Sequence, residues 1–173
     1  MAAKVIVVMG VSGSGKSTIG ESIAVKLGSK FVDGDDLHPQ SNIDKMASGQ
    51  ALSDSDRKPW LESINALLRT WLRHKQTGVV VCSALKKSYR NMLRESAQGL
   101  QFIYLDGDQS LIEKRMRQRQ NHFMKDTMLA SQFAILQRPE DEGDVFIVDI
   151  DCSIEQVVDN CLQQLTNKHK ESS

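Results

Sequence analysis

The stretch VIVVMGVSGSGKST, residues 5–18, decides the fold of this chain. Its apolar start, residues 5–9, is unbroken, which is typical of a strand buried on both faces of a sheet. Residues 10–17 then match the pattern G-x-x-x-x-G-K-[ST] at every fixed position. Ile19, Ile23 and Leu27 follow at helical spacing. The stretch therefore predicts a strand, a glycine-rich turn and a helix, the setting in which this pattern binds phosphate groups.

The glycine-rich turn is expected to bind ATP mainly through its backbone. Glycines allow successive N–H groups to face inward as an anion-binding nest, and the N-terminus of the following helix adds partial positive charge. In this pattern Lys16 reaches the β- and γ-phosphates, and the hydroxyl of Ser17 binds Mg²⁺. The residues expected to contact ATP are Gly10, Val11, Ser12, Gly13, Ser14, Gly15, Lys16, Ser17 and Thr18.

Beyond this stretch, apolar runs typical of strands alternate with helical patterns. Further strands are expected at 30–33, 79–82, 102–105 and 145–148, and helices at 54–76, 87–97, from about 109, 126–138 and 153–166. This alternation predicts an α/β fold in which a five-stranded parallel sheet carries helices on both faces. Such sheets bind ligands at the carboxyl ends of their strands, so we expect the functional residues just after residues 9, 33 and 82.

The longest helical pattern, residues 54–76, carries its own boundary signal. Ser53 and Asp56 have the spacing of a capping box. Pro59 is then expected in or near the first turn, where a missing N–H has little effect. One face of this helix collects the apolar residues Trp60, Leu61, Ile64, Leu67, Leu68, Trp71 and Leu72.

Size and charge argue against several function classes. The chain has 173 residues, which fits one domain with one core, so we treat residues 1–173 as a single domain. Lys plus Arg and Asp plus Glu both number 22, so charge gives no support for a nucleic-acid partner or a membrane surface. No apolar run approaches the ~20 residues of a membrane span. The chain also lacks a signal-peptide pattern, and we expect a cytoplasmic protein.

The cysteines and histidines do not have the spacing of a disulfide framework or a zinc site. Cys82, Cys152 and Cys161 are odd in number and form no C-x-x-C pair. The four histidines show no H-E-x-x-H spacing. We therefore expect no structural metal and no disulfide.

Two classes of nucleotide-binding protein fit the sequence poorly. A GTPase should carry N-K-x-D, and the nearest match, residues 167–170, lacks the aspartate. A motor-type ATPase should have a strand that ends in adjacent acids, whereas neither Asp106 nor Asp149 is followed by glutamate. The short chain, with acids after the second strand and a basic helix after the third, favours a small-molecule kinase.

Two carboxylates follow the second strand. Asp33 and Asp35, separated by Gly34, lie where an acceptor alcohol belongs. Phosphoryl transfer needs a group that orients this hydroxyl and takes its proton, and a second carboxylate can serve the hydration shell of magnesium. The alternative is an acidic turn that caps a helix at 39–48. His38, taken alone, is more typical of a turn residue than of a catalyst.

Basic residues follow the third and fourth strands. Lys86, Arg90 and Arg94 repeat every four residues, which predicts either a clamp for an anionic acceptor or a solvated stripe on a helix. Arg115 and Arg119 face the same way on the next helix. They indicate either mobile arginines that close over the phosphates or an exposed basic helix end.

Taken together, these motifs resemble those of the gluconate kinase family, within the wider group of P-loop kinases that includes shikimate and nucleotide kinases. The resemblance depends most on the phosphate loop, on D-G-D-x-L-H-P at 33–39 and on C-S-A-L-K-K at 82–87. Further matches are Asn42-Ile43, Lys45-Met46, Gly49, Leu52, Asp56-Arg57, Pro59-Trp60-Leu61, Tyr89-Arg90, His122-Phe123 and residues 148–151. The resemblance extends from about residue 5 to residue 166.

The resemblance implies a P-loop kinase fold with a helical lid near 115–137 and a substrate-closing segment near 38–60. It implies transfer of the terminal phosphate of ATP to D-gluconate, with Mg²⁺ as the cofactor, in a possible homodimer. A second hypothesis is a kinase for another small acceptor, such as shikimate or a nucleoside monophosphate. A third is a nucleotide-binding module without catalysis.

The resemblance also implies roles for single residues. Asp35 is the expected base or hydroxyl-positioning residue, and Asp33 joins Ser17 at the magnesium ion. Arg115 and Arg119 are the expected lid arginines, which act with Lys16 in catalysis. The residues expected to bind the substrate are Asp33, Asp35, His38, Arg57, Lys86, Arg90 and His122.

Overall fold

The sheet has five strands, all parallel. The computed structural model describes residues 3–118 and 126–171. Its strands are β1 (Val5–Met9), β2 (Lys30–Asp33), β3 (Gly78–Val81), β4 (Leu100–Asp106) and β5 (Val145–Asp149). They lie in the order β2-β3-β1-β4-β5, and each neighbouring pair is parallel. The predicted α/β fold with a five-stranded parallel sheet is therefore confirmed.

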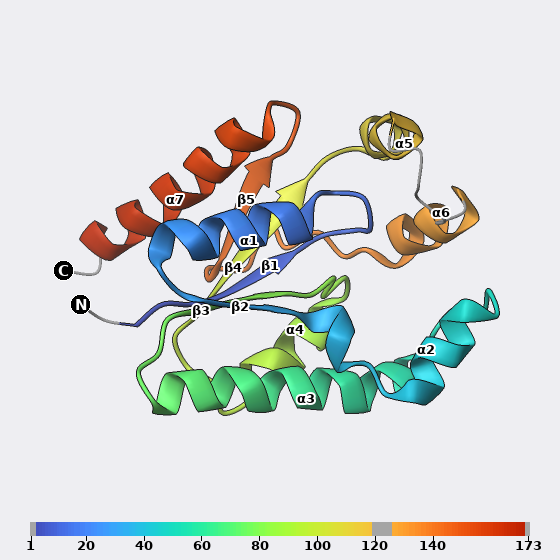
Figure 1. Ribbon diagram of the computed structural model, residues 1–173, viewed down its shortest axis with the longest axis horizontal. Coiled ribbons are helices and arrows are strands. Elements are labelled where there is room, and N and C mark those ends of the chain that lie inside the picture. The colour runs from blue at the N-terminus through green and yellow to red at the C-terminus, as the bar shows by residue number, and fades with distance from the viewer. Residues whose placement is uncertain (1–2, 119–125, 172–173) are drawn as a thin grey trace.

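Helices cover both faces of the sheet. Figure 1 shows α1 (Lys16–Leu27) and α7 (Ile154–Glu171) on one face, and α3 (Asp54–Arg73) and α4 (Lys87–Arg94) on the other. The remaining helices lie beyond the carboxyl ends of the strands (Figure 1): η1 (Gly34–Leu37), α2 (Gln40–Ala47), α5 (Gln109–Gln118) and α6 (Asp126–Ile135). The functional residues are therefore expected between these outer helices and the sheet.

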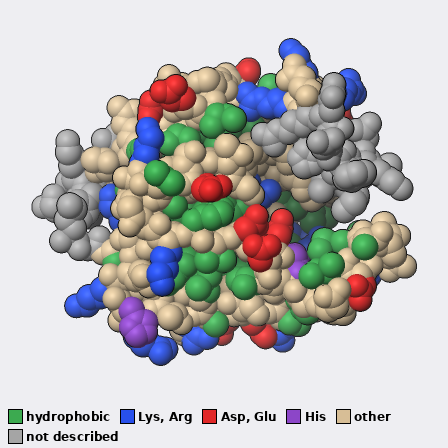
Figure 2. Space-filling model, in the orientation of Figure 1, with side chains coloured by type: hydrophobic (Ala, Val, Ile, Leu, Met, Phe, Trp, Pro, Cys, Tyr) green, Lys and Arg blue, Asp and Glu red, His purple; other side chains and the backbone are tan. Residues whose placement is uncertain are grey.

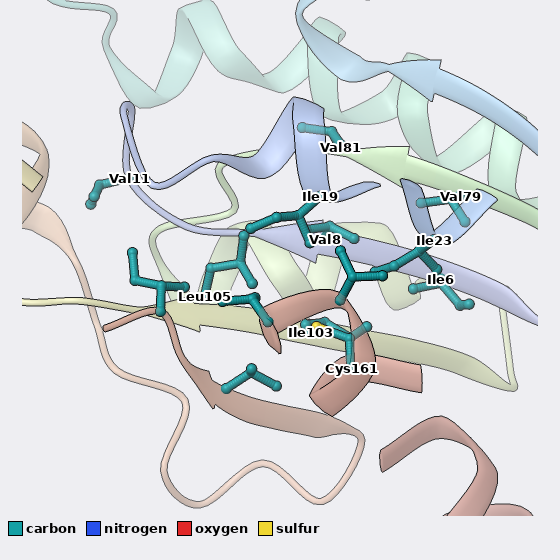
Figure 3. Packing of buried hydrophobic residues seen from close by; sticks show 14 of the residues in the cluster. Ile6, Val8, Val11, Ile19, Ile23, Val79, Val81, Ile103, Leu105 and Cys161 are labelled. Carbon is teal, nitrogen blue, oxygen red and sulfur yellow. The ribbon is translucent and has the colours of Figure 1, made fainter. Parts of the chain in front are cut away.

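The central strand β1 is buried on both faces, as its apolar run predicts. Alternate side chains enter two separate cores: Ile6 and Val8 pack with α1 and α7, whereas Val5, Val7 and Met9 pack with α3 and α4. Figure 3 shows the first core, with Ile19 and Ile23 of α1 against Ile6 and Val8. Packing on both sides fixes where β1 ends and hence where the phosphate loop begins.

The long helix α3 begins as predicted and ends earlier. Both bonds of the Ser53–Asp56 capping box are present, and Pro59 lies in the second turn. The helix ends at Arg73, and Lys75 has a left-handed φ of 53°. Its buried residues are Trp60, Leu61, Ile64, Asn65, Leu68 and Trp71.

Other predicted helices also end too late. We expected the helix at 87–97, which is α4, to reach residue 97, but it ends at Arg94, and Ser96 has a φ of 56°. We expected α6 to reach residue 138, but it ends at Ile135, before Pro139, whose ring disfavours helical backbone in the residue that precedes it. Within the described parts of the chain, no helix has both the length and the apolar character to cross a bilayer.

Candidate active site

The phosphate loop has the backbone that its glycines predict. Gly13 and Gly15 have φ values of 82° and 91°, in the left-handed region that favours glycine. A side chain at Gly13 would also collide with α5, because an added Cβ would lie 2.9 Å from Cγ and from Sδ of Met116. The loop therefore needs glycine here both for its turn and for its packing beneath α5.

Helix α1 presents free amides to this loop. Its first bond runs from the N–H of Ile19 to the carbonyl of Gly15 at 2.9 Å. The amides of Lys16, Ser17 and Thr18 therefore have no intrahelical acceptor and face out of the helix N-terminus, where an anion is favoured.

A buried hydroxyl in the loop supports phosphate binding. Ser14 is 2% exposed, and its Oγ has no hydrogen-bond partner among the described residues. Leaving a buried polar atom unpaired is unfavourable, and a phosphate oxygen would supply the missing partner. The residues of the loop therefore fit the polyphosphate of a nucleotide.

Lys16 lies folded back over the loop. Its Nζ donates to the carbonyl of Val11 at 3.1 Å. Burial lowers the pKa of this ammonium group, and the negative charges of Asp35 and Asp33 partly oppose that effect. A bound phosphate would act in the same direction as these carboxylates and favour the charged form.

Ser17 and Asp33 form a pair of oxygen ligands. The Ser17 hydroxyl donates to Oδ2 of Asp33 at 3.2 Å, which joins the start of α1 to the end of β2. A hydroxyl and a carboxylate fit Mg²⁺, which usually binds to one or two protein oxygens together with substrate phosphates and water. The other carboxylate oxygen, Oδ1, accepts the N–H of Asp35 at 3.0 Å and fixes the turn that follows.

Asp35 lies at the open edge of the site. Figure 2 shows acidic side chains over η1, beside a hollow in the surface, and Asp35 and Asp36 of η1 are both exposed. Partial burial among its neighbours raises the pKa of Asp35, whereas nearby Lys16 lowers it. Because the carboxylate still reaches solvent, water moderates this rise. Asp35 is therefore placed to meet a substrate and to interact with Lys16.

His38 forms part of the wall next to Asp35. Its ring stacks on Trp60 with the centroids 4.2 Å apart and the planes 14° apart. Burial lowers the pKa of this imidazole, and the Asn42 amide nitrogen lies 3.2 Å from Nδ1. Trp60 is itself fixed, because its Nε1 donates to the carbonyl of Gly34 at 2.7 Å. His38 is therefore a neutral, packed residue at neutral pH, which fits a wall better than a proton donor.

Two cations meet over one aromatic ring. The Arg57 guanidinium and the Lys86 ammonium lie 5.4 Å and 5.5 Å from the centroid of the Tyr89 ring. Arg57 donates to the Tyr89 hydroxyl at 2.9 Å, and that hydroxyl donates to Asp54. Asp54 also accepts from Lys86 at 3.1 Å. The arrangement gathers two positive groups between the starts of α3 and α4, where they can meet an anion.

Arg90, which we expected to bind the substrate, is enclosed in this structure and pairs with other groups of the chain, so that role stays a prediction. Arg90 is 0% exposed, and its Nη2 pairs with Glu142 at 2.6 Å. Its other donors serve the carbonyls of Ala84, Leu85 and Gln137.

Arg94 also pairs with acids rather than facing solvent, since it binds Glu142 and Asp144. The repeat of Lys86, Arg90 and Arg94 predicted one shared helix face. Because α4 begins at Lys87, Lys86 precedes the helix and does not share that face with Arg90. Neither the clamp of three cations nor the solvated stripe describes this segment.

Of the residues expected in the lid, Arg115 lies in the part of the chain that the structure describes. Arg115 of α5 donates to the carbonyl of Cys152 at 3.1 Å, beside the turn that follows β5. Arg119 and His122 lie outside the described residues. The structure therefore places Arg115 at the β5–α7 turn, and the roles expected for Arg119 and His122 stay predictions.

Sequence patterns missed two polar residues near the site. Asp54 sits between the two cations, and Gln132 of α6 bonds to Ser12 of the phosphate loop. Neither belongs to a motif quoted above, and Gln132 is separated from Ser12 by 120 positions. Asp54 had a signal in the sequence, because it lies in the first turn of a predicted helix. Gln132 had none.

Comparisons with known proteins find relatives over most of the chain. A family model described as an AAA domain matches residues 5–139. The thermoresistant gluconokinase of Escherichia coli is 50% identical over 160 residues, which cover 92% of this chain and 91% of the relative. The thermosensitive gluconokinase of the same organism is 48% identical over 164 residues, which cover 94% of this chain and 88% of the relative.

A solved structure shows the same architecture. The crystal structure of a gluconokinase from Sinorhizobium meliloti superposes with a TM-score of 0.91 at 44% identity, and the match covers 97% of this chain and 94% of that one. The match to the family model, over residues 5–139, includes the phosphate loop. With this fold, this loop and relatives at this identity, the chain belongs to the gluconokinase family of P-loop kinases.

Proposed function

We propose that the protein transfers the terminal phosphate of ATP to D-gluconate and releases ADP and 6-phospho-D-gluconate. The observation that carries the proposal is the meeting of a phosphate loop with two carboxylates at one sheet edge: Ser17 bonds to Asp33, and Asp35 interacts with Lys16. The family relatives, which are named gluconokinases, support gluconate as the acceptor.

In the proposed reaction, the 6-hydroxyl oxygen forms a bond to the γ-phosphorus while the bond from that phosphorus to the β,γ-bridging oxygen breaks. Asp35 aligns the hydroxyl and accepts its proton. Lys16 stabilises the negative charge that develops on the leaving ADP. Mg²⁺, held by Ser17 and Asp33, would neutralise charge on the β- and γ-phosphates. Because the transferred group carries its negative charge throughout, positioning and charge stabilisation account for most of the rate increase.

The gluconate carboxylate is proposed to meet Arg57 and Lys86. Their side chains are 18% and 28% exposed, so both cations can be reached without unfolding a core. Both lie next to Asp54, at 4.0 Å and 3.1 Å from its Oδ1. This assignment replaces Arg90, whose guanidinium is enclosed and fully paired with other groups.

Several family traits complete the proposal. The segment 115–137 would serve as a lid and 38–60 as a substrate-closing segment within one domain, with Arg115 near the nucleotide. The three cysteines are all free thiols, which suits a reducing compartment, and we place the enzyme in the cytoplasm. We also propose that it assembles as a homodimer.

A panel of acceptors tests this function. Purified protein with ATP and Mg²⁺ is offered D-gluconate, other sugar acids, shikimate and nucleoside monophosphates, and ADP release is followed with a coupled assay. We expect turnover with D-gluconate well above that with the other acceptors. Clear turnover on another acceptor without turnover on gluconate would support the second hypothesis, and ATP binding without turnover on any acceptor would support the third.

A further inference from the structure

A glutamine from α6 holds the tip of the phosphate loop by two hydrogen bonds. Its Oε1 accepts the backbone N–H of Ser12 at 2.7 Å, and its Nε2 donates to Oγ of the same serine at 2.9 Å. The residue is Gln132, and its side chain is half-buried. A carboxamide suits this contact because it offers one acceptor and one donor side by side.

The neighbouring loop residue is held by the other outer helix. The space beside Gly13 is filled by Met116 and Ile112 of α5, which would lie 2.9 Å and 3.1 Å from an added Cβ. Consecutive residues of the phosphate loop, Ser12 and Gly13, therefore contact α6 and α5. The contact with α5 is apolar, and the contact with Gln132 of α6 is polar. Gln132 bonds to the backbone of Ser12 as well as to its side chain.

The position of Ser12 gives this contact a consequence for the reaction. Ser12 lies between the strand end and the left-handed turn at Gly13, in the part of the loop where successive amides surround phosphate oxygens. A small displacement of such a loop moves every amide that meets the phosphates. Errors of about 1 Å in positioning can lower a rate by about 10²-fold.

We propose that Gln132 is a positioning residue for phosphoryl transfer, which acts through Ser12 to hold the phosphate loop in its reactive form. This inference rests on the proposed function, because it concerns the same reaction. It assigns to α6 a direct part in setting the loop, separate from any role of the arginines.

Three variants separate this role from simple stabilisation. Gln132→Met keeps the length of the side chain and removes both bonds. Gln132→Glu keeps an acceptor for the Ser12 amide, removes the donor and adds a negative charge beside the loop. Ser12→Ala removes only the hydroxyl and leaves the backbone N–H. Gln164→Glu makes the same charge change on an exposed position of α7 and serves as the control.

The measurement is kcat and KM for ATP and for gluconate, with Tm recorded for each variant. Wild-type turnover with gluconate is established first, so failure of the proposed function is seen before any variant is read. We expect Gln132→Met to lower kcat/KM for ATP by about 10-fold to 10²-fold, with KM for gluconate within about twofold. Ser12→Ala should lose less, and Gln164→Glu should match wild type.

Stability and kinetics together decide between the two roles. If Gln132 only stabilises the fold, Gln132→Met should lower Tm and leave kcat/KM for ATP of the folded protein within twofold of wild type. If Gln132 positions the phosphate loop, Gln132→Met should lower kcat/KM for ATP in protein that Tm shows to be folded at the assay temperature. Gln132→Glu should be impaired under either role, because its charge repels the polyphosphate. Gln132→Met with kinetics within twofold of wild type would overturn the proposal. If Gln132→Met is too unstable to assay, the comparison of Ser12→Ala and Gln132→Glu with wild type replaces it, and normal kinetics in both would overturn the proposal.

Discussion

Asp35 combines exposure to substrate with an unusual affinity for protons. Burial raises its pKa and Lys16 partly restores it, so the carboxylate takes up a proton at a higher pH than an ordinary aspartate. A proton acceptor must be ionised to work. Turnover should therefore fall as the pH is lowered through this raised pKa, and it should be constant well above it.

Asp35→Asn tests this assignment. We expect kcat to fall by about 10²-fold to 10⁴-fold and the acid limb of the kcat profile to disappear, while ATP affinity stays near normal. The profile is measured at saturating ATP, Mg²⁺ and gluconate. Asp36→Asn, which changes the exposed next residue, is the matched control: it should keep the rate, and its acid limb should move only slightly, to lower pH, because the charge of Asp36 is the smallest of the effects that raise the pKa of Asp35. Normal turnover in Asp35→Asn would show that the carboxylate is not the group that handles the hydroxyl.

At this scale, the sequence predicts residues whose neighbours are close in the chain. Lys16 and Ser17 are placed by a contiguous motif. The Ser17–Asp33 bond joins residues that follow β1 and end β2, at the same edge of one parallel sheet, with β3 between the two strands. The ion pair of Arg90 could not be predicted, because its partner Glu142 is 52 positions away and no local pattern connects the two. The role of a cation depends on whether a carboxylate is buried against it, and that is a property of the folded chain.

Among the elements, α3 positions the acceptor side and depends on its first turn. The Ser53 hydroxyl accepts the N–H of Asp56 at 3.1 Å, and Asp56 in turn accepts from Ser53 at 2.8 Å. Asp56 also pairs with Lys45 of α2 at 2.6 Å. These bonds lower the pKa of Asp56 to about 2, the bond from Lys45 most of all. The start of α3 is therefore joined to α2 by one carboxylate.

Asp56→Asn should lower the stability of the protein at neutral pH. A carboxylate with a lowered pKa stabilises the folded state above its unfolded pKa of 3.8, and that contribution is lost as the pH falls toward about 2. The difference in free energy of unfolding between wild type and variant should therefore shrink over that range. Urea unfolding at several pH values measures it.

A second helix supplies the control for this prediction. Asp159 of α7 pairs with Lys26 across a surface where the two side chains are 57% and 49% exposed. Exposed pairs contribute little, so Asp159→Asn should change stability by less than about 1 kcal/mol. A loss in Asp56→Asn that stays constant down to pH 2 would mean that the charge of Asp56 is not what stabilises α3.

Element positions were predicted better than element ends. Apolar spacing located every strand and the face of α3, because burial imposes that spacing on the sequence. The ends depend on single backbone angles, such as the left-handed Lys75 and Ser96, and neither lysine nor serine signals such an angle. The start of α3 was predicted correctly because a capping box is a chemical signal in the sequence itself.

Across the whole molecule, Arg90 joins three segments that are distant in sequence. It binds the carbonyls after β3, the carbonyl of Gln137 and the carboxylate of Glu142, which is 8% exposed. The chain between α6 and β5 is thereby attached to α4. Removing one member of a buried ion pair leaves an uncompensated charge, and this typically lowers stability by about 3–5 kcal/mol.

Arg90→Met should therefore change mainly stability, and Arg57→Met should change mainly KM for gluconate. We expect Arg90→Met to lower the free energy of unfolding by about 3–5 kcal/mol and to leave KM for gluconate unchanged in the folded protein. Arg57→Met should raise KM for gluconate by about 10-fold or more, since a charge-assisted contact contributes about 1.5–3 kcal/mol, with a small change in stability. Urea unfolding and gluconate kinetics give both quantities. Normal stability with a raised KM in Arg90→Met would return Arg90 to the substrate site.

The contact between Gly13 and α5 bears on how this enzyme can evolve. Any side chain at that position meets Met116, and the backbone angle is unfavourable to every other residue as well. Ser12 and Ser17 lack this double restriction, since neither has a left-handed φ. In a library randomised over the loop and selected for growth on gluconate, surviving clones should keep glycine at 13 unless Met116 has become smaller in the same clone, and even those should grow slowly.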